Sequence, residues 1–369
     1  MKLKRPDYTN SILNVSNSFL KYYNVPTKYS SQTNLDSALQ KGYNHIIYIL
    51  LDGMGSNIIK HHLDKNDALR KYMVEEITSV FPPTTVAATN AVLSGKPPIT
   101  TGYLGWVQYF EHIDSDLTIF LNKDFYTDEE PNELVRHKYL DYKDILEQSK
   151  EFNPNLSTNI IFPKFIEQGT GESFKDEIEQ VLMITHNKDT SFNYVYWTQP
   201  DLIEHKEGIY SNAVKDMIKG LNNDFESLIS NVSDDTLVVC IADHGLTDVE
   251  ELNIFSNEHI VKMLKRKPSI EPRAINFFVK SEYITEFKTE FNSKYKDIYL
   301  LMTKADILES ELFGTGDKHQ LIDMFLGDYI AVAIDKYMFT VNDKKSYKAH
   351  HAGLTEDEMM VPLIIYSKK

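Results

Sequence analysis

The chain has 369 residues, which is long enough for one large domain with an insertion or for two domains. Acidic residues outnumber basic ones, 54 against 39, and the formal net charge is -15. This balance argues against a protein that coats DNA or RNA, because such proteins need a basic surface to displace counterions. It does not exclude a small anionic substrate, since bound metal ions can reverse the local charge.

The N-terminal segment and the cysteine content bear on the compartment. The single cysteine, Cys240, lies in an apolar run and can form no internal disulfide, which suits a reducing compartment. The segment MKLKRPDYTN lacks the apolar stretch of a signal peptide. No apolar run approaches the roughly 18 residues that a membrane helix requires. We therefore expect a cytoplasmic protein that does not cross a membrane, and the sequence leaves its oligomeric state open.

The first part of the chain alternates helical and strand-like segments. Residues 10–23 carry apolar side chains at helical spacing. Residues 45–51, HIIYILL, are typical of a strand buried on both faces. A strand is expected over 76–81, and a helix of small residues over 85–93 that ends at Gly95.

An aromatic and charged segment, 107–155, then reads as an excursion from the core. The elements expected after it are a helix, a strand, a helix and a strand, at 174–187, 193–198, 211–231 and 237–242. Strands that alternate with helices predict an α/β fold, with a mostly parallel central sheet flanked by helices.

A second pattern of strands and helices begins near residue 252. Its expected elements are a strand, a helix and a strand, at 274–280, 281–294 and 329–334. The last apolar run, 361–366, reads as a strand that returns to the main sheet. We predict a core of residues 1–251 and 346–369, interrupted by an inserted α/β cap at 252–345.

Acidic side chains follow three of the expected strands. Asp52, Asp201 and Asp243 each come within a few residues of a strand end. Ligands of open α/β sheets bind beyond the carboxyl ends of the strands, so these side chains should project over one edge. One Asp in such a place is often only a turn or cap residue. Three of them are harder to explain in that way.

Histidines accompany two of these carboxylates. His205 follows Asp201 by four residues, a spacing that places both on one face of a helical turn. His244 directly follows Asp243, and the next residue, Gly245, permits a sharp turn that lets both side chains converge. Either pair alone could be a solvated Asp and His at a loop or a helix start.

Two further histidines, His350 and His351, precede the last strand. They could also be exposed loop residues. Mixed Asp and His ligation suits zinc best, with manganese or iron as alternatives. Three carboxylates, three imidazoles and one hydroxyl are the materials of a two-metal phosphoryl-transfer site.

The hydroxyl is predicted at the start of the helix that follows Pro82-Pro83. Backbone N–H groups at a helix N-terminus favour an anion. A hydroxyl that touches a metal there can be deprotonated at neutral pH and attack phosphorus. Without the ligand set, Thr84 would be an N-cap and Thr85 an ordinary first-turn residue. With it, we predict Thr85 as the nucleophile and Thr84 as the cap.

The order of these motifs resembles the alkaline phosphatase superfamily, and within it most closely the nucleotide pyrophosphatase/phosphodiesterase (type I phosphodiesterase) branch. The motifs are DGMG, FPPTTVAATNAVLSGKPP, YWTQPDLIEHKEG, ADHGLTD and HHAGLTEDEMMVPL. The resemblance implies an alkaline-phosphatase-like core and a hydrolase that acts on small phosphate esters or anhydrides, such as nucleotides.

The resemblance also implies a role for each site residue. The segment His351-Ala352-Gly353-Leu354-Thr355 matches the family pattern, which favours His351 over His350 as the late ligand. Thr85 would form a phospho-threonine that water then hydrolyses. The implied ligands are Asp201, His205 and His351 for one zinc, and Asp52, Asp243 and His244 for the other.

Two positions depart from the family pattern. Val86 stands where eukaryotic-like diesterases carry an aromatic residue that stacks a nucleobase, and Gly105-Trp106 replaces a Gly-Asn step that binds a phosphoryl oxygen. A related phosphonate hydrolase, phosphomonoesterase or phosphomutase therefore stays an alternative. So does a non-enzymatic metal-binding sensor or scaffold.

Charge at the reacting group bears on the substrate. A phosphomonoester usually calls for an Arg or Lys clamp, and the sequence next to Thr85 offers none. This favours a phosphodiester. The cap could still supply a cation, and its candidates are Arg273, Lys318 and His319. Trp106 and Tyr109 could form an apolar wall for a leaving group, or belong to ordinary core packing.

Overall fold

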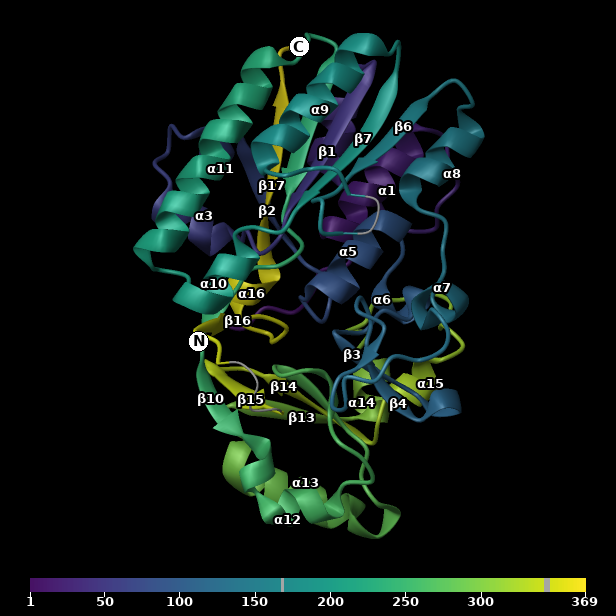
Figure 1. The fold of residues 1–369 in the computed structure, drawn as a ribbon, viewed down its shortest axis with the longest axis vertical. Helices are drawn as coiled ribbons and strands as arrows, with labels where there is room; N and C mark the ends of the chain where they lie inside the picture. The colour runs from purple at the N-terminus through teal and green to yellow at the C-terminus, as the bar shows by residue number, and fades with distance from the viewer. Residues whose placement is uncertain (167–168, 342–345) are drawn as a thin grey trace.

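The apolar runs of the sequence form a six-stranded main sheet, in the upper half of Figure 1. The structure is a computed structural model and describes residues 1–166, 169–341 and 346–369. In spatial order the strands are β2 (Met73–Thr78), β17 (Met360–Ser367), β8 (Thr236–Ile241), β1 (His45–Leu51), β7 (Ser191–Trp197) and β6 (Ser157–Ile161). The last four run parallel, whereas β17 is antiparallel to both of its neighbours.

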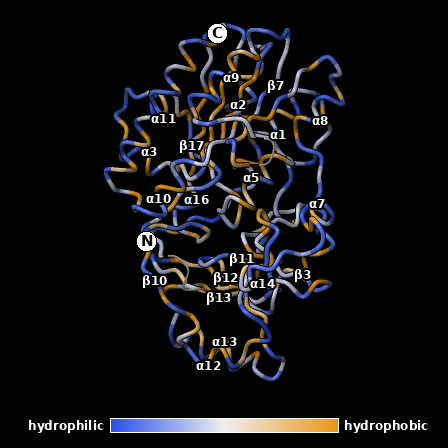
Figure 2. The backbone as a smooth tube through the Cα atoms, viewed as in Figure 1, coloured by the Kyte–Doolittle hydropathy of each residue, from blue (hydrophilic) through white to orange (hydrophobic). Residues whose placement is uncertain are grey.

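Helices cover both faces of this sheet (Figure 1). One layer contains α3 (Ser56–His62), α9 (Phe174–Asn187) and α11 (Asn212–Asn231). The other contains α1 (Ile12–Tyr22), α5 (Thr85–Ser94) and α8 (Ile145–Phe152). Between the layers, every residue of β1 is buried, and Figure 2 shows the central strands as the apolar interior. The expected α/β fold with a mostly parallel central sheet is confirmed.

A second, antiparallel sheet of seven strands lies below the main sheet in Figure 1. Its strands in spatial order are β13 (Tyr299–Thr303), β14 (Tyr329–Ala333), β12 (Ala274–Phe277), β11 (Ser269–Glu271), β3 (Val107–Phe110), β4 (Ser115–Thr118) and β5 (Lys123–Asp124). Helices α12 (Glu258–Met263) and α13 (Ile284–Tyr295) pack below it, where Phe287 and Phe291 of α13 are fully buried.

The second sheet combines two stretches of the chain. Strands β3, β4 and β5 belong to the segment expected to be an excursion, and Val107 pairs with Ile270 of β11. None of the main-sheet strands comes from residues 252–345. The division into a core and an inserted cap stays a prediction, and residues 342–345 of the predicted cap lie outside the described residues.

Several element boundaries differ from the sequence-based expectation. The strand expected over 76–81 begins and ends three residues earlier, as β2. Beyond β2, Ser79 donates its N–H to the carbonyl of Met359 (2.8 Å) and its hydroxyl to the carbonyl of Asp243 (2.5 Å). Strand β6 had no distinct signal in the sequence.

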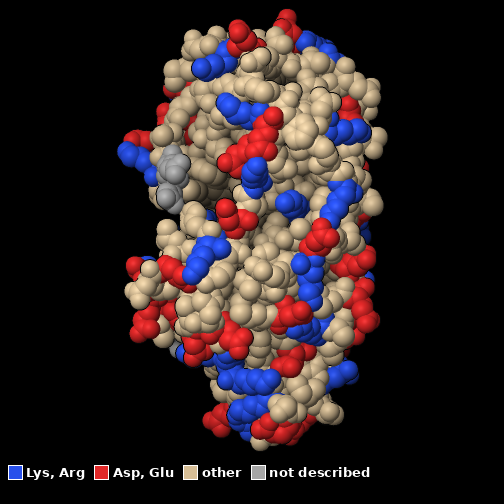
Figure 3. Space-filling view, turned by 90° about the vertical axis from the view of Figure 1, so that its right-hand side faces the viewer, with Lys and Arg blue, Asp and Glu red and all other residues tan. Residues whose placement is uncertain are grey.

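The surface matches the mixed composition. On the face shown in Figure 3, basic and acidic side chains are interspersed rather than sorted into one basic field. Cys240 is buried within β8. Among the helices of the described residues, none combines the length and the apolar character needed to cross a bilayer.

Candidate metal centre

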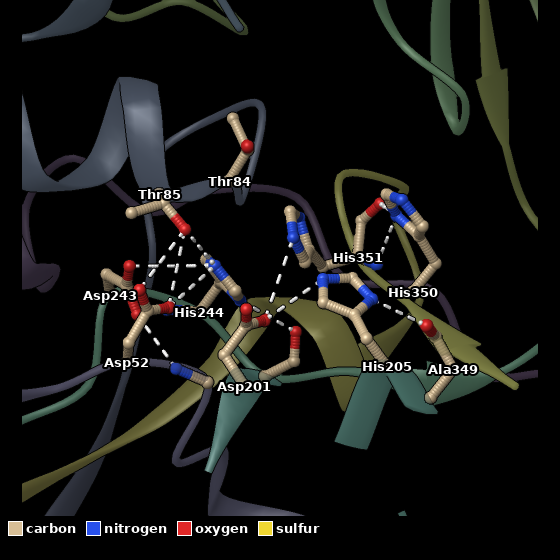
Figure 4. A network of polar contacts seen from close by, with 12 residues as sticks. Asp52, Thr84, Thr85, Asp201, His205, Asp243, His244, Ala349, His350 and His351 are labelled. Atoms are coloured by element: carbon tan, nitrogen blue, oxygen red, sulfur yellow. Dashed lines mark hydrogen bonds and ion pairs between the residues drawn. The ribbon is translucent and has the colours of Figure 1, made fainter. Parts of the chain in front are cut away.

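The six predicted metal ligands meet at one edge of the main sheet, as Figure 4 shows. They come from the ends of β1, β7 and β8 and from the segment after β16 (Ala349–His350). Five of them are buried, and His205 is partly buried. The ligands and their positions are Asp52 after β1, Asp243 and His244 after β8, Asp201 and His205 on α10 (Asp201–Glu207), and His351 after β16.

Asp52, Asp243 and His244 form one buried group, whose ligand atoms all lie within 4.8 Å of one another. The Nε2 of His244 lies 3.4 Å from Asp52 Oδ1 and 3.5 Å from Asp243 Oδ2. Asp243 Oδ1 accepts the N–H groups of Gly53 (3.1 Å) and His244 (3.0 Å). Its Oδ2 has no hydrogen-bond partner among the described residues. A buried carboxylate oxygen left in this way fits a bound cation.

The second predicted group is Asp201, His205 and His351, whereas the second compact triad among the described residues is Asp201, His244 and His351. Asp201 Oδ1 lies 3.3 Å from His205 Nε2 and 3.8 Å from His351 Nε2, and no described residue forms a hydrogen bond with it. The Nδ1–H of His205 donates to the carbonyl of Ala349 (2.8 Å), which leaves the Nε2 lone pair facing Asp201.

His244 lies between the two groups. Its ring stacks on that of His351, with centroids 3.9 Å apart. The ligand atoms of His244, Asp201 and His351 also lie within 4.8 Å of one another. His350 packs behind the centre against the ring of His205, at a centroid distance of 4.7 Å. The two groups together fit a two-metal site.

Two glycines let the ligand-bearing loops approach closely. Gly53 has a φ of +77°, and a Cβ there would lie 2.8 Å from the Cα of Asp201. The N–H of Asp201 donates to the carbonyl of Asp52 (3.0 Å), so the first two ligand loops are joined directly. A Cβ at Gly245 would lie 2.1 Å from the carbonyl oxygen of Asp357. Any other residue at either position would push the loops apart.

The electrostatics of the centre call for a cation. Burial, and then the charges of Asp243 and Asp201, raise the pKa of Asp52 well above its ordinary value. Burial raises the pKa of Asp243 to about 7. Burial, followed by the charge of His244, lowers the pKa of His351 well below its ordinary value. Carboxylates that repel one another beside a neutral imidazole are stabilised when divalent ions bind between them.

Thr85 is the first residue of α5 and points into the first group (Figure 4). Its Oγ1 lies 3.3 Å from Asp52 Oδ1 and 3.2 Å from His244 Nε2. Thr84 occupies the N-cap position, but its hydroxyl does not accept an N–H of the helix as expected for a cap. It donates instead to Glu271 Oε1, at 2.6 Å.

Two residues at the centre were not predicted from the sequence. Tyr196, near the end of β7, donates its hydroxyl to Asp52 Oδ2. Its place in the apolar run NYVYWT, just before Asp201, was the available signal. Glu271 of β11 contacts Thr84 through a separation of 187 residues, and no local pattern marks it.

The cations suggested by the sequence have other partners. Arg273 is fully buried, and its guanidinium donates to both carboxylate oxygens of Glu358, at 2.6 and 2.7 Å. Lys318 pairs with Asp323 at 2.7 Å. His319 lies within hydrogen-bond distance of the carbonyl of Tyr139 (3.1 Å). Arg273 is therefore part of a structural ion pair rather than a free clamp for substrate.

Solved structures of similar fold share this architecture. Murine ectonucleotide pyrophosphatase/phosphodiesterase 5 superposes with a TM-score of 0.66 at 14% identity, over 87% of this chain and 88% of that one. An inactive variant of it in complex with AMP, in which alanine replaces a threonine, gives 0.62 at 14% identity, over 87% of both chains. Phosphonoacetate hydrolase from Sinorhizobium meliloti 1021, in complex with phosphonoformate, gives 0.62 at 12% identity, over 86% and 89%. At these identities the likeness establishes the fold.

Sequence comparison identifies the family. No curated protein sequence matches the chain significantly. The family described as type I phosphodiesterase/nucleotide pyrophosphatase matches residues 46–353, which contain all six clustered ligands and Thr85. With this match over most of its length, the chain belongs to the type I phosphodiesterase/nucleotide pyrophosphatase family of hydrolases, within the alkaline phosphatase superfamily.

Proposed function

We propose that this protein is a di-zinc phosphodiesterase or nucleotide pyrophosphatase in which Thr85 is the nucleophile. One zinc ion binds Asp201, His205 and His351, and the other binds Asp52, Asp243 and His244. The observation that carries the proposal is the position of Thr85 Oγ1, within 3.4 Å of both Asp52 and His244. The hydroxyl therefore faces the same space as one of the two buried ligand groups.

The residues of the chain can carry out two successive displacements. When bound, the zinc ions supply positive charge that stabilises the phosphoryl oxygens and lowers the pKa of an adjacent hydroxyl. The Thr85 hydroxyl gives up its proton to solvent and its Oγ attacks phosphorus, so an Oγ–P bond forms while the leaving group departs with the electron pair of its bond to phosphorus. A water molecule then attacks phosphorus, so that a new O–P bond forms as the Oγ–P bond breaks, and a proton from that water returns to Thr85 Oγ. The N–H groups of the first turn of α5 favour the anionic phosphoryl group.

A phosphodiester is the preferred substrate class in this proposal. A diester carries one charge at the reacting phosphorus and needs fewer cations than a monoester. Arg273, the one buried cation that the sequence suggested, is held by Glu358. The murine relative binds AMP in a variant that lacks a threonine, which supports a nucleotide. Val86 is fully buried in the core, so the base must be held by side chains other than residue 86.

A substrate panel tests the proposal. We expect zinc-loaded protein to hydrolyse p-nitrophenyl thymidine monophosphate with a kcat/KM at least tenfold above that for p-nitrophenyl phosphate, which is a difference of about 1.4 kcal/mol in transition-state binding. Removal of the metal with a chelator should abolish turnover, and added zinc should restore it.

The same panel separates the alternatives. A tenfold preference for the monoester would contradict the diesterase assignment and favour a phosphatase or mutase. Turnover of phosphonoacetate alone would favour a phosphonate hydrolase. Turnover of none of the substrates by protein that holds metal would favour a sensor or scaffold.

A further inference from the structure

Glu271 connects the second sheet to the helix that begins with Thr85. It lies at the end of β11 and is 5% exposed. A single oxygen, Oε1, accepts two hydrogen bonds, from the hydroxyl of Thr84 (2.6 Å) and from the backbone N–H of Trp106 (2.7 Å). These donors belong to two other segments, the N-cap of α5 and the loop before β3. One carboxylate therefore joins three parts of the chain directly beside the nucleophile.

The hydrogen bond from Thr84 to Glu271 leaves the first-turn N–H groups of α5 without a side-chain cap. A threonine at an N-cap position ordinarily accepts an N–H group of the first turn. Here the Thr84 hydroxyl donates to Glu271 and makes no such cap bond. The side chain of Thr84 therefore does not compete for the first-turn N–H groups, which stay directed at an anion. The same bond restrains the backbone of the residue before Thr85.

Packing alone does not explain a glutamate at position 271, because burying its carboxyl group costs desolvation free energy. Burial, followed by the charge of Asp201, raises the pKa of Glu271 to about 7, while the bonds from Thr84 and Trp106 lower it. An apolar side chain would fill the same space without this desolvation cost.

We propose that Glu271 is a positioning residue for catalysis, which acts on Thr85 through its hydrogen bond to Thr84. It holds the Thr84 hydroxyl away from the helix N–H groups and fixes the nucleophile relative to the metal ligands. This role rests on the proposed function, because it requires Thr85 to attack the substrate. The second sheet would then contribute a positioning residue to the reaction at the edge of the main sheet.

The test compares zinc-loaded variants with a diester substrate. Glu271→Ala should lower kcat at least tenfold while KM and bound zinc stay within twofold of wild type, because the substrate and metal ligands are untouched. Glu271→Gln keeps a carbonyl oxygen in place and should recover most of the loss. Thr84→Val, which retains the shape of threonine, should resemble Glu271→Ala. The double variant Glu271→Ala/Thr84→Val should be no slower than Glu271→Ala, because both substitutions remove the same hydrogen bond between Thr84 and Glu271.

Glu177→Ala is the matched control, because Glu177 is also a buried glutamate but lies on α9. It should leave kcat per folded molecule unchanged.

A kcat for Glu271→Ala within twofold of wild type would overturn the proposal. So would multiplicative losses in the double variant, or a Glu271→Gln variant as slow as Glu271→Ala. If Glu271→Ala does not fold, Thr84→Val decides in the same way. An active wild type with these results would contradict the role of Glu271 only, whereas an inactive zinc-loaded wild type would contradict the proposed function itself.

Discussion

Tyr196 forms a hydrogen bond with Asp52, which is one of the predicted metal ligands. Its hydroxyl donates to Asp52 Oδ2, and Thr85 Oγ1 lies 3.3 Å from Oδ1 and 3.4 Å from Oδ2 of the same carboxylate. Partners of this kind orient a ligand, and their loss typically costs about 10–100-fold in metal affinity. We expect Tyr196→Phe to weaken zinc binding by at least tenfold in a competition titration with a chromophoric chelator.

The neighbouring tyrosine of the same strand provides the control. Tyr194 is fully buried, and its hydroxyl has no hydrogen-bond partner among the described residues. Tyr194→Phe should therefore leave zinc affinity unchanged. Equal affinities for Tyr196→Phe and wild type would show that Asp52 needs no such support.

The buried carboxyl group of Glu177 should make the stability of the protein depend on pH. It is fully buried, and neither carboxylate oxygen has a partner among the described residues. Burial, followed by the charge of Asp176, raises the pKa of Glu177 to about 9 from its ordinary value of 4.5. The folded state therefore holds its proton while the unfolded state releases it. This contribution to stability is greatest below pH 4.5 and declines as the pH rises toward 9.

Replacing this carboxyl with an amide should remove the decline. We compare the free energy of unfolding of Glu177→Gln with that of wild type. The difference should shift in favour of the variant by about 1 kcal/mol for each pH unit between pH 5 and 8. Urea unfolding at several pH values measures the difference. A difference that does not change with pH would mean that Glu177 is ionised in the folded protein.

At the scale of elements, the Arg273–Glu358 pair fixes the loop that carries His351. The carboxylate of Glu358, on α16 (Glu356–Met359), accepts hydrogen bonds from the guanidinium of Arg273, from the N–H of Gly353 (2.7 Å) and from the hydroxyl of Thr355 (2.6 Å). Both charged side chains are fully buried. The pair thereby attaches the second sheet to the loop after β16.

Breaking this pair should be strongly destabilising. Arg273→Met leaves the Glu358 carboxylate buried and unpaired, and should lower the free energy of unfolding by about 3–5 kcal/mol. Lys318→Met, which breaks an exposed pair with Asp323, should change it by less than about 1 kcal/mol. Denaturant unfolding of both variants is the measurement. Similar losses in the two variants would contradict a structural role for the buried pair.

The sequence predicts elements well where the signal is local. The strand at 45–51 and the helix at 174–187 have the expected bounds, because continuous apolar runs and helical periodicity determine them. The second sheet shows the limit of such prediction. Strand β3 pairs with β11 through Val107 and Ile270, and nothing in either short segment indicates a partner so far along the chain.

At the scale of the whole molecule, sheet topology explains why the convergence of the predicted ligand residues could be expected from the sequence. Parallel strands bring their carboxyl ends to one edge, so Asp52, Asp201 and Asp243 converge although they are far apart in sequence. Residues that reach the centre from the second sheet obey no such rule. Glu271 is the example, because its contact with Thr84 depends on how the two sheets pack.

The central claim is that Thr85 takes part covalently at the two-metal centre. Its most direct test is mass spectrometry of zinc-loaded protein, acid-quenched during turnover of p-nitrophenyl thymidine monophosphate. We predict a thymidylyl group on Thr85 in wild type, a smaller amount on residue 85 in Thr85→Ser, and none in Thr85→Ala, which should also lose most of its activity and keep its zinc. Wild-type rates in Thr85→Ala, or a label on another residue, would contradict the account.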